Sequence, residues 1–205
     1  DFSPQNLLFA TGSWEGSVGI WEISSGNLLR TIQGSEYGIR DVEFSPDGSL
    51  LAAAFDDNSI LIWRVVDGTL VHSLRGHDGA VISIVFSNDG LTLASASEDQ
   101  TIGLWKLADG TLVSHLTGHD AAVKDITLSL DGSLLASASD DATVRLWRVS
   151  DGFLLRTLEV EDSVASIALA PNGYYLAAGT VSGTIRFWGF SQALLPEIEN
   201  TPTSP

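Results

Sequence analysis

The sequence predicts an all-β protein built from just under five copies of one structural unit. Five tryptophans recur at an almost constant spacing, 42 residues for three intervals and 41 for the last: Trp21, Trp63, Trp105, Trp147 and Trp188. Two adjacent copies, residues 65–105 and 107–147, are identical at 24 of 41 aligned positions. A fixed period of this length is typical of repeat architectures, in which the unit and its copy number decide the fold.

Each copy divides into four short apolar segments that we expect to be β-strands. In the third copy these segments are Ala80–Ser87, Leu91–Ser97, Thr101–Leu107 and Thr111–Leu116. Asp-Gly pairs separate several of them, and such a pair between apolar runs is a strong hairpin signal. No stretch has helical periodicity. Four antiparallel strands in 42 residues predict one blade of a β-propeller.

The blades follow one another through residues 1–190, and we expect them at approximately 2–34, 35–76, 77–118, 119–160 and 161–195. The first copy lacks nearly all of its first strand, because Phe2-Ser3-Pro4 aligns with Phe44-Ser45-Pro46 at the end of that strand. Residues 193–195 are expected to form a short last strand, and residues 196–205 a polar Pro/Thr/Ser tail or linker. The propeller is therefore expected to be incomplete or open.

The composition of the strands suits blades that stand between two neighbours. Ile102 and Leu104 are expected on one face of a sheet and Trp105 on the other, so both faces are apolar. The second strand is made of small residues, as in Ala94–Ser97 and Ala136–Ser139. Small side chains allow blades to approach closely near the central axis.

The chain resembles the WD-repeat β-propeller family over residues 2 to about 190. The resemblance rests on the tryptophan period together with Gly76-His77 and Gly118-His119, each followed by a tryptophan 28 residues after the histidine. Propellers of this family usually have about seven blades, so the resemblance implies that about two are missing. The aspartate that often follows the tryptophan in the family is replaced at every copy, by Glu22, Arg64, Lys106, Arg148 and Gly189.

The resemblance also implies a structural hydrogen-bonded tetrad of His, Ser, Asp and Trp in two copies. The matching positions are His77, Ser95, Asp99 and Trp105, and then His119, Ser137, Asp141 and Trp147. In such a tetrad the aspartate accepts from the histidine, the histidine bridges to the serine and the serine reaches the indole N–H, so each buried polar group gains a partner. The second and fifth copies are degraded, with Ala53 and Ala178 at the serine position.

The same residue types also occur in a nucleophilic Ser-His-Asp triad, which makes a hydrolase an alternative. The set recurs 42 residues later, although an enzyme needs a single site, and no Gly-x-Ser-x-Gly motif is present. A network repeated in each blade is therefore the favoured interpretation.

Metal binding is not expected. The acidic pairs at residues 56–57, 98–99 and 140–141 lack the alternating oxygen ligands and the glycine of a calcium loop. His72 and His115 lie in fourth strands at non-equivalent positions, where surface histidines are favoured over metal ligands. We therefore expect no metal and no cofactor.

Composition restricts the partners. The chain has 26 Asp and Glu against 10 Lys and Arg, giving a formal net charge of −16, which argues against nucleic acid and anionic membranes. No apolar run approaches the roughly 18 residues of a membrane span. The absence of cysteine excludes disulfides and thiolate metal sites but leaves the compartment open, with a cytoplasmic location favoured.

Partner binding is expected at the loops where the first and third strands of the blades begin. Trp14, Asp56, Glu98 and Asp140 immediately precede the tetrad-acid position, and Trp14 is the aromatic exception. Tyr37 and Arg40 lie nearby and are unlike their repeat counterparts; the counterpart of Arg40 in the fourth copy is Lys124. Aromatic residues and arginine are common interface anchors. Drifted loop residues are the alternative explanation.

These observations favour a non-catalytic scaffold of the WD-repeat type that binds a protein or peptide. A sensor or regulatory propeller within a larger multidomain signalling protein is the main alternative, and a hydrolase is the third. The apolar ends are expected to self-associate or to be covered by further WD repeats of a parent protein.

Overall fold

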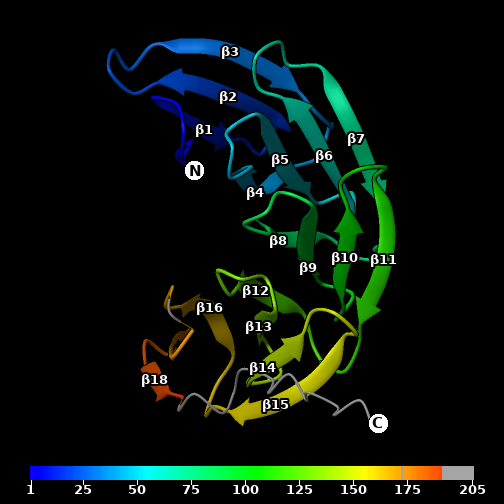
Figure 1. Ribbon diagram of the computed structural model, residues 1–205, viewed down its shortest axis with the longest axis vertical. Helices are drawn as coiled ribbons and strands as arrows, with labels where there is room; N and C mark the ends of the chain where they lie inside the picture. The colour runs from blue at the N-terminus through cyan, green and yellow to red at the C-terminus, as the bar shows by residue number, and fades with distance from the viewer. Residues whose placement is uncertain (172, 191–205) are drawn as a thin grey trace, which may run out of the picture.

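The structure is a computed structural model that describes residues 1–171 and 173–190, and it consists of five antiparallel sheets arranged in an unclosed arc (Figure 1). The first sheet contains β1 (Leu8–Gly12), β2 (Ser17–Glu22) and β3 (Leu28–Gln33). The second contains β4 (Ile39–Phe44), β5 (Leu50–Phe55), β6 (Ser59–Arg64) and β7 (Leu70–Arg75). The third contains β8 (Val81–Phe86), β9 (Thr92–Ser97), β10 (Ile102–Lys106) and β11 (Thr111–Leu116).

The fourth sheet contains β12 (Val123–Leu128), β13 (Leu134–Ser139), β14 (Thr143–Arg148) and β15 (Phe153–Glu159), and the fifth contains β16 (Val164–Leu169), β17 (Tyr175–Thr180) and β18 (Ile185–Gly189). Each sheet is a meander in which strands adjacent in sequence are paired. The predicted all-β fold class is confirmed: five antiparallel sheets of three or four strands form an unclosed, partial propeller. The expected last strand at residues 193–195 and the tail at 196–205 lie outside the described residues.

The antiparallel order gives the arc two distinct sides. The connections β1–β2, β5–β6, β9–β10, β13–β14 and β17–β18 lie at one end of the strands, together with the connections between sheets; we call this side the loop face. The remaining hairpin turns lie at the other end, which we call the turn face. Strands β4, β8, β12 and β16 line the inner side of the arc, and β3, β7, β11 and β15 form its outer rim (Figure 1).

The turns after β4, β8 and β12 are built from a recurring Ser-x-Asp-Gly sequence. In the first of them, Ser45 Oγ donates to Asp47 Oδ1 at 2.6 Å and accepts from Leu50 N–H at 2.9 Å. Gly48 has a φ of 68°, a left-handed conformation that glycine adopts without a steric penalty. The hydrogen bond from Ser45 contributes most to holding the pKa of Asp47 below its ordinary value. The same Ser–Asp bond recurs at Ser87–Asp89 and Ser129–Asp131.

Adjacent sheets are held together by packing a tryptophan-bearing face onto a face of small and aliphatic residues. Trp105 of the third sheet belongs to one core cluster with Ala52 and Ala54 of the second, and all three are almost completely buried. Trp147 packs in the same way against Ala94 and Ala96 of the third sheet. The small residues expected in the second strands are therefore in the core, where they let the indole rings approach the neighbouring sheet.

The innermost strands would otherwise present unpaired backbone N–H groups at a sheet edge. Side-chain carboxylates of one sheet accept hydrogen bonds from the innermost strand of the next sheet. Ile84 N–H donates to Asp41 at 2.9 Å and Phe86 N–H to Glu43 at 2.7 Å. The same kind of contact joins β16 to β12, where Ile167 N–H donates to Asp125, and it joins β4 to the segment before β1, where Phe44 N–H donates to Asp1.

The two terminal sheets each expose an apolar face. In the first sheet, Phe9 stacks on Trp21 with ring centroids 5.8 Å apart, and Phe2 lies beside Phe9. In the fifth sheet, Ile185 and Phe187 are 64% and 75% exposed. Their repeat counterparts in the fourth sheet, Val144 and Leu146, are completely buried against the fifth.

We expect Glu43→Gln to reduce the pH dependence of stability. Burial raises the pKa of the Glu43 carboxyl from 4.5 to about 8, against the hydrogen bond from Phe86 N–H and with added repulsion from Asp41. Because the folded-state pKa is the higher one, the stabilisation is complete below pH 4.5 and is lost as pH rises through about 8. Glutamine keeps the acceptor for Phe86 without the titration. Urea unfolding from pH 4.5 to 8.5 measures the difference.

The exposed Glu98→Gln is the matched control for the loss of one acidic group. The fall in the free energy of unfolding between pH 4.5 and 8.5 should be smaller in Glu43→Gln than in this control. Equal falls in the two variants would contradict the role given to Glu43.

Candidate functional site

A polar network lies at the junction between the second and third sheets. His77, in the connection between β7 and β8, is buried; its Nδ1 lies 2.8 Å from Asp99 Oδ2 and its Nε2 lies 2.7 Å from Ser95 Oγ. Trp105 Nε1–H donates to the same Ser95 hydroxyl at 2.7 Å. All atoms are satisfied when Nδ1–H donates to Asp99 and Nε2 accepts from the Ser95 hydroxyl. The four residues named from the sequence are thus brought together.

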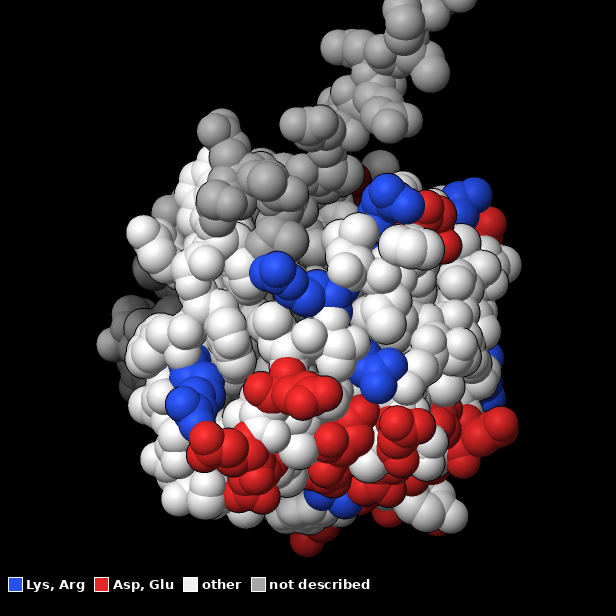
Figure 2. Space-filling model, turned by 90° about the horizontal axis from the view of Figure 1, so that it is seen from below, with Lys and Arg blue, Asp and Glu red and all other residues white. Residues whose placement is uncertain are grey.

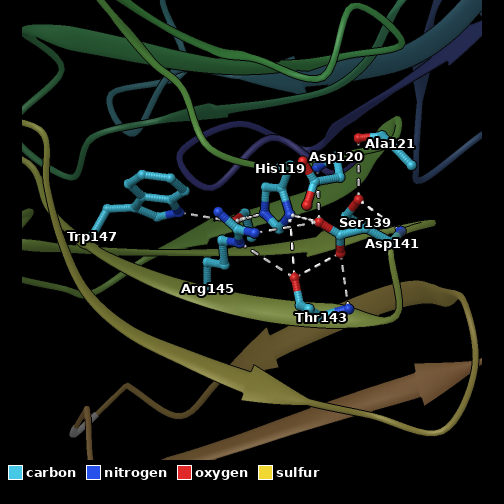
Figure 3. Close-up of polar contacts among 9 residues, drawn as sticks. His119, Asp120, Ala121, Ser139, Asp141, Thr143, Arg145 and Trp147 are labelled. Atoms are coloured by element: carbon cyan, nitrogen blue, oxygen red, sulfur yellow. Dashed lines mark hydrogen bonds and ion pairs between the residues drawn. The ribbon is translucent and has the colours of Figure 1, made fainter.

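A second network repeats this geometry in the fourth sheet (Figure 3). His119 Nδ1 is 2.7 Å from Asp141 Oδ2, His119 Nε2 is 2.7 Å from Ser137 Oγ, and Trp147 Nε1–H donates to Ser137 at 2.9 Å. This network has an added cation, because Arg145 Nη2 lies 3.7 Å from Asp141 Oδ2. Arg145 occupies the position that Gly103 holds in the third sheet.

The two titratable groups of the second network, Asp141 and His119, differ in whether hydrogen bonds outweigh the effect of burial on their pKa. Burial opposes ionisation of Asp141, but hydrogen bonds from Thr143 and His119 outweigh it and lower the pKa of the carboxyl to about 2. Burial lowers the pKa of His119, and the nearby Arg145 acts in the same direction. The network is therefore a neutral imidazole beside an ionised carboxylate at neutral pH.

The two serine hydroxyls of these networks are not accessible to a substrate. Ser95 and Ser137 have no exposed surface, and each hydroxyl is enclosed by an imidazole and an indole. A substrate carbonyl has no approach to either oxygen. What the arrangement does is tie the connection that enters a sheet to the second and third strands of that sheet.

The other sheets contain reduced versions of the network. In the second sheet, Ser35 Oγ donates to Asp57 at 3.1 Å. In the first sheet, Trp21 Nε1–H donates to Thr11 Oγ1 at 2.9 Å. Sequence analysis did not identify Thr11, although it occupies the repeat position of Ser95 and carries a hydroxyl.

His72 and His115 are half-buried and make contacts that the sequence analysis did not anticipate. His72 Nε2 lies 2.8 Å from the carbonyl of Leu107 and so joins the second sheet to the third. His115 stacks on His77 with ring centroids 5.4 Å apart. Its Nε2 is buried without a hydrogen-bond partner among the described residues. The expectation that both are surface histidines is therefore revised. Within residues 1–171 and 173–190, no group of three His, Asp or Glu could hold a metal ion.

The seven residues expected at a partner-binding face do not form one cluster. Arg40 joins two of them, because its guanidinium lies 4.9 Å from the centre of the Trp14 ring and its Nε donates to Asp56 at 2.5 Å. Trp14 is 70% exposed, and Tyr37 is exposed in the adjoining connection between sheets. Lys124 and Asp140 form a separate ion pair, with Lys124 Nζ 3.6 Å from Asp140 Oδ2. The seventh residue, Glu98, is an exposed acid.

Acidic side chains dominate the surroundings of these loops. Figure 2 shows Asp and Glu gathered along one edge of the molecule with few Lys and Arg among them. Trp14 and Arg40 therefore stand out as an aromatic–cation pair in an acidic protein. No helix among the described residues is long and apolar enough to cross a membrane.

The fold and the repeated networks define a class of protein, a propeller segment whose blades are secured by His, Ser, Asp and Trp. The sequence matches the WD40 family, described as WD domain, G-beta repeat, over residues 1–22, 26–64, 68–106, 110–148 and 152–189. The chain therefore belongs to the WD40 repeat family, with five WD repeats, and the resemblance inferred from the sequence is confirmed. No curated protein was found to match the chain. WD40 repeats generally bind proteins and are usually non-catalytic.

We expect His119→Ala to lower the free energy of unfolding by about 1–3 kcal/mol, because it leaves the buried Ser137 hydroxyl and the Asp141 carboxylate without their partner. Ser35→Ala, at the equivalent position, removes two longer hydrogen bonds of a half-buried hydroxyl, one to Asp57 at 3.1 Å and one from Tyr37 N–H at 3.3 Å, and should cost less. Urea midpoints compare the two variants. Equal or reversed losses would show that the network does not stabilise the sheet.

We expect His115→Thr to raise the free energy of unfolding by about 1 kcal/mol, because it removes a buried nitrogen that lacks a partner. The repeat supports the change, since the equivalent positions carry Thr31, Ser73 and Thr157. His72→Thr is the control, and it should destabilise because it removes the bond to Leu107. Thermal unfolding measures both; a lower Tm for His115→Thr would contradict the assignment.

Proposed function

We propose that this chain is a non-catalytic scaffold that binds a protein or peptide through the loop face around Trp14, Tyr37, Arg40 and Asp56. The observation that carries the proposal is the exposed Trp14 ring with the Arg40 guanidinium stacked on it. Nothing in the five-sheet framework requires this pair, because none of the other copies carries an aromatic residue at the position of Trp14, and the next three copies carry acids there. Exposed tryptophan and arginine are the residue types that most often dominate binding energy at interfaces.

The arrangement of the pair suits recognition. Asp56 fixes the Arg40 side chain, so less conformational entropy is lost when a partner binds. The stacked guanidinium holds the indole in one orientation, and the side chain, which is 70% exposed, remains accessible to an aliphatic or proline side chain of a partner. Tyr37 extends the apolar surface with a hydroxyl at its end. The buried serines of the His-Ser-Asp-Trp networks support the non-catalytic part of the proposal.

Trp14→Ala should weaken a peptide selected against the wild-type chain by roughly 30-fold, which corresponds to about 2 kcal/mol for an interface anchor. Phage display on the immobilised chain supplies the peptide, and isothermal titration calorimetry measures Kd. Val113→Ala is the control, because Val113 is similarly exposed but lies on the outer strand β11. The same Kd for both variants would remove Trp14 from the binding face. Ester hydrolysis abolished by Ser95→Ala but not by Ser137→Ala would overturn the non-catalytic role.

We further propose that the exposed faces of the first and fifth sheets bind further WD repeats or a second copy of the chain. Each face is equivalent to one side of an internal junction between sheets, as the burial of Val144 and Leu146 illustrates. Covering several hundred Å² of apolar surface at about 25 cal/mol/Å² contributes on the order of 10 kcal/mol before association costs.

The 205-residue chain should therefore self-associate at micromolar concentration. Sedimentation velocity measures the assembly, and Phe187→Lys should shift the distribution toward monomer because it places a charge on the exposed face. Sedimentation of the wild-type chain as a compact monomer that binds no hydrophobic dye would refute this proposal.

A further inference from the structure

A groove of about 540 Å³ opens on the turn face between the first and second sheets. Its lining combines aliphatic side chains with two guanidinium groups, and the residues that matter for the argument are Leu8, Leu29, Arg30, Arg64, Val65 and Val66. The groove lies at the end of the strands opposite Trp14 and Arg40, so it is separate from the proposed binding face. Its volume is within the range of about 300–1,000 Å³ that is usual for ligand sites.

Val65 lies in the lining of the groove and is partly buried. Its repeat counterparts Leu107 and Phe190 are larger and are buried between sheets, whereas the fourth copy also carries a valine, Val149. Valine fills less of the space between two sheets than leucine or phenylalanine.

The groove places two of the ten Lys and Arg residues of an acidic chain side by side. Arg30 donates to the carbonyls of Asp67 at 2.9 Å and Val66 at 3.2 Å, so its partners are neutral dipoles that do not cancel its charge. Arg64 pairs with the Asp67 carboxylate at 3.0 Å, in an exposed ion pair that contributes little stability. A guanidinium in such a pair is available to a second carboxylate.

Aliphatic side chains on both walls of the groove remain in contact with solvent. Leu29 on β3 is 56% exposed, and Val66 in the turn after β6 is 77% exposed. Leu8 and Val65 form partly buried floor residues between them. The combination offers apolar contact on each side of a positively charged centre.

From this geometry we infer that the groove binds a short peptide segment in which a Glu or Asp side chain is flanked by aliphatic residues. The carboxylate pairs with Arg64 and Arg30, since guanidinium–carboxylate pairs combine charge with directed hydrogen bonds. The flanking aliphatic side chains cover Leu29 and Val66. Asp47 at the rim disfavours a polyanion such as nucleic acid, because it adds negative charge beside the cations.

The inference is tested with a defined probe, the fluorescein-labelled peptide acetyl-Leu-Glu-Ile-Glu-Leu-amide, by fluorescence anisotropy on the full chain. The wild-type chain should bind it, and Arg64→Ala should weaken Kd at least tenfold. The control variant is Arg148→Ala, which removes the repeat-equivalent arginine and its ion pair with Asp151 but lies outside the groove. Both variants change the net charge by the same amount, so a general electrostatic effect cancels.

A second probe with Gln in place of both Glu residues should bind at least tenfold more weakly than the acidic peptide. Val66→Asp provides a second variant on the opposite wall, at an exposed turn position where folding is not at risk, and it should also abolish binding. The inference is overturned by no binding to the wild-type chain, by equal Kd values for Arg64→Ala and Arg148→Ala, or by equal binding of the two probes. Trp14→Ala should leave this Kd unchanged, which separates the groove from the proposed function of the loop face.

Discussion

The fold depends on the junction between neighbouring sheets, because a blade that stands between two others must bury both of its faces. One face carries the indole of the third strand and the other carries alanine, serine and aliphatic residues, as Trp105 against Ala52 and Ala54 shows. Neither face is stable in water alone. The polar networks, the small residues of the second strands and the carboxylate contacts of the innermost strands all serve this one junction.

The repeat made much of this predictable. Strand order and turn positions follow from the Asp-Gly spacing, and the expected strand Thr111–Leu116 has the bounds found in the structure. The residues of the two networks also come together as the resemblance to WD-repeat proteins implied, and positions repeated with the tryptophan period recur in the same place of each sheet. A periodic sequence pattern therefore predicts the contacts that recur in each copy.

Contacts between sheets were harder to predict, because they depend on how far one sheet is rotated against the next. Nothing in the sequence around Asp41 or Glu43 indicates that each carboxylate reaches the backbone of another strand. The stacking of His115 on His77 and the contact of His72 with Leu107 likewise depend on two histidines, His72 and His115, that are not repeated at the equivalent positions of the other copies. The groove beside Val65 also depends on how the first and second sheets meet, which the sequence of either sheet does not indicate.

The relation between the repeats and the sheets has a consequence for synthesis of the chain. The WD repeat at residues 26–64 contains β3, which completes the first sheet, together with β4, β5 and β6 of the second. A sheet therefore receives its outer strand only when the next repeat emerges from the ribosome. Until then the third strand, which carries the tryptophan, is an unpaired edge of that sheet. Each sheet is thus completed by the following repeat, which couples folding along the chain in the direction of translation.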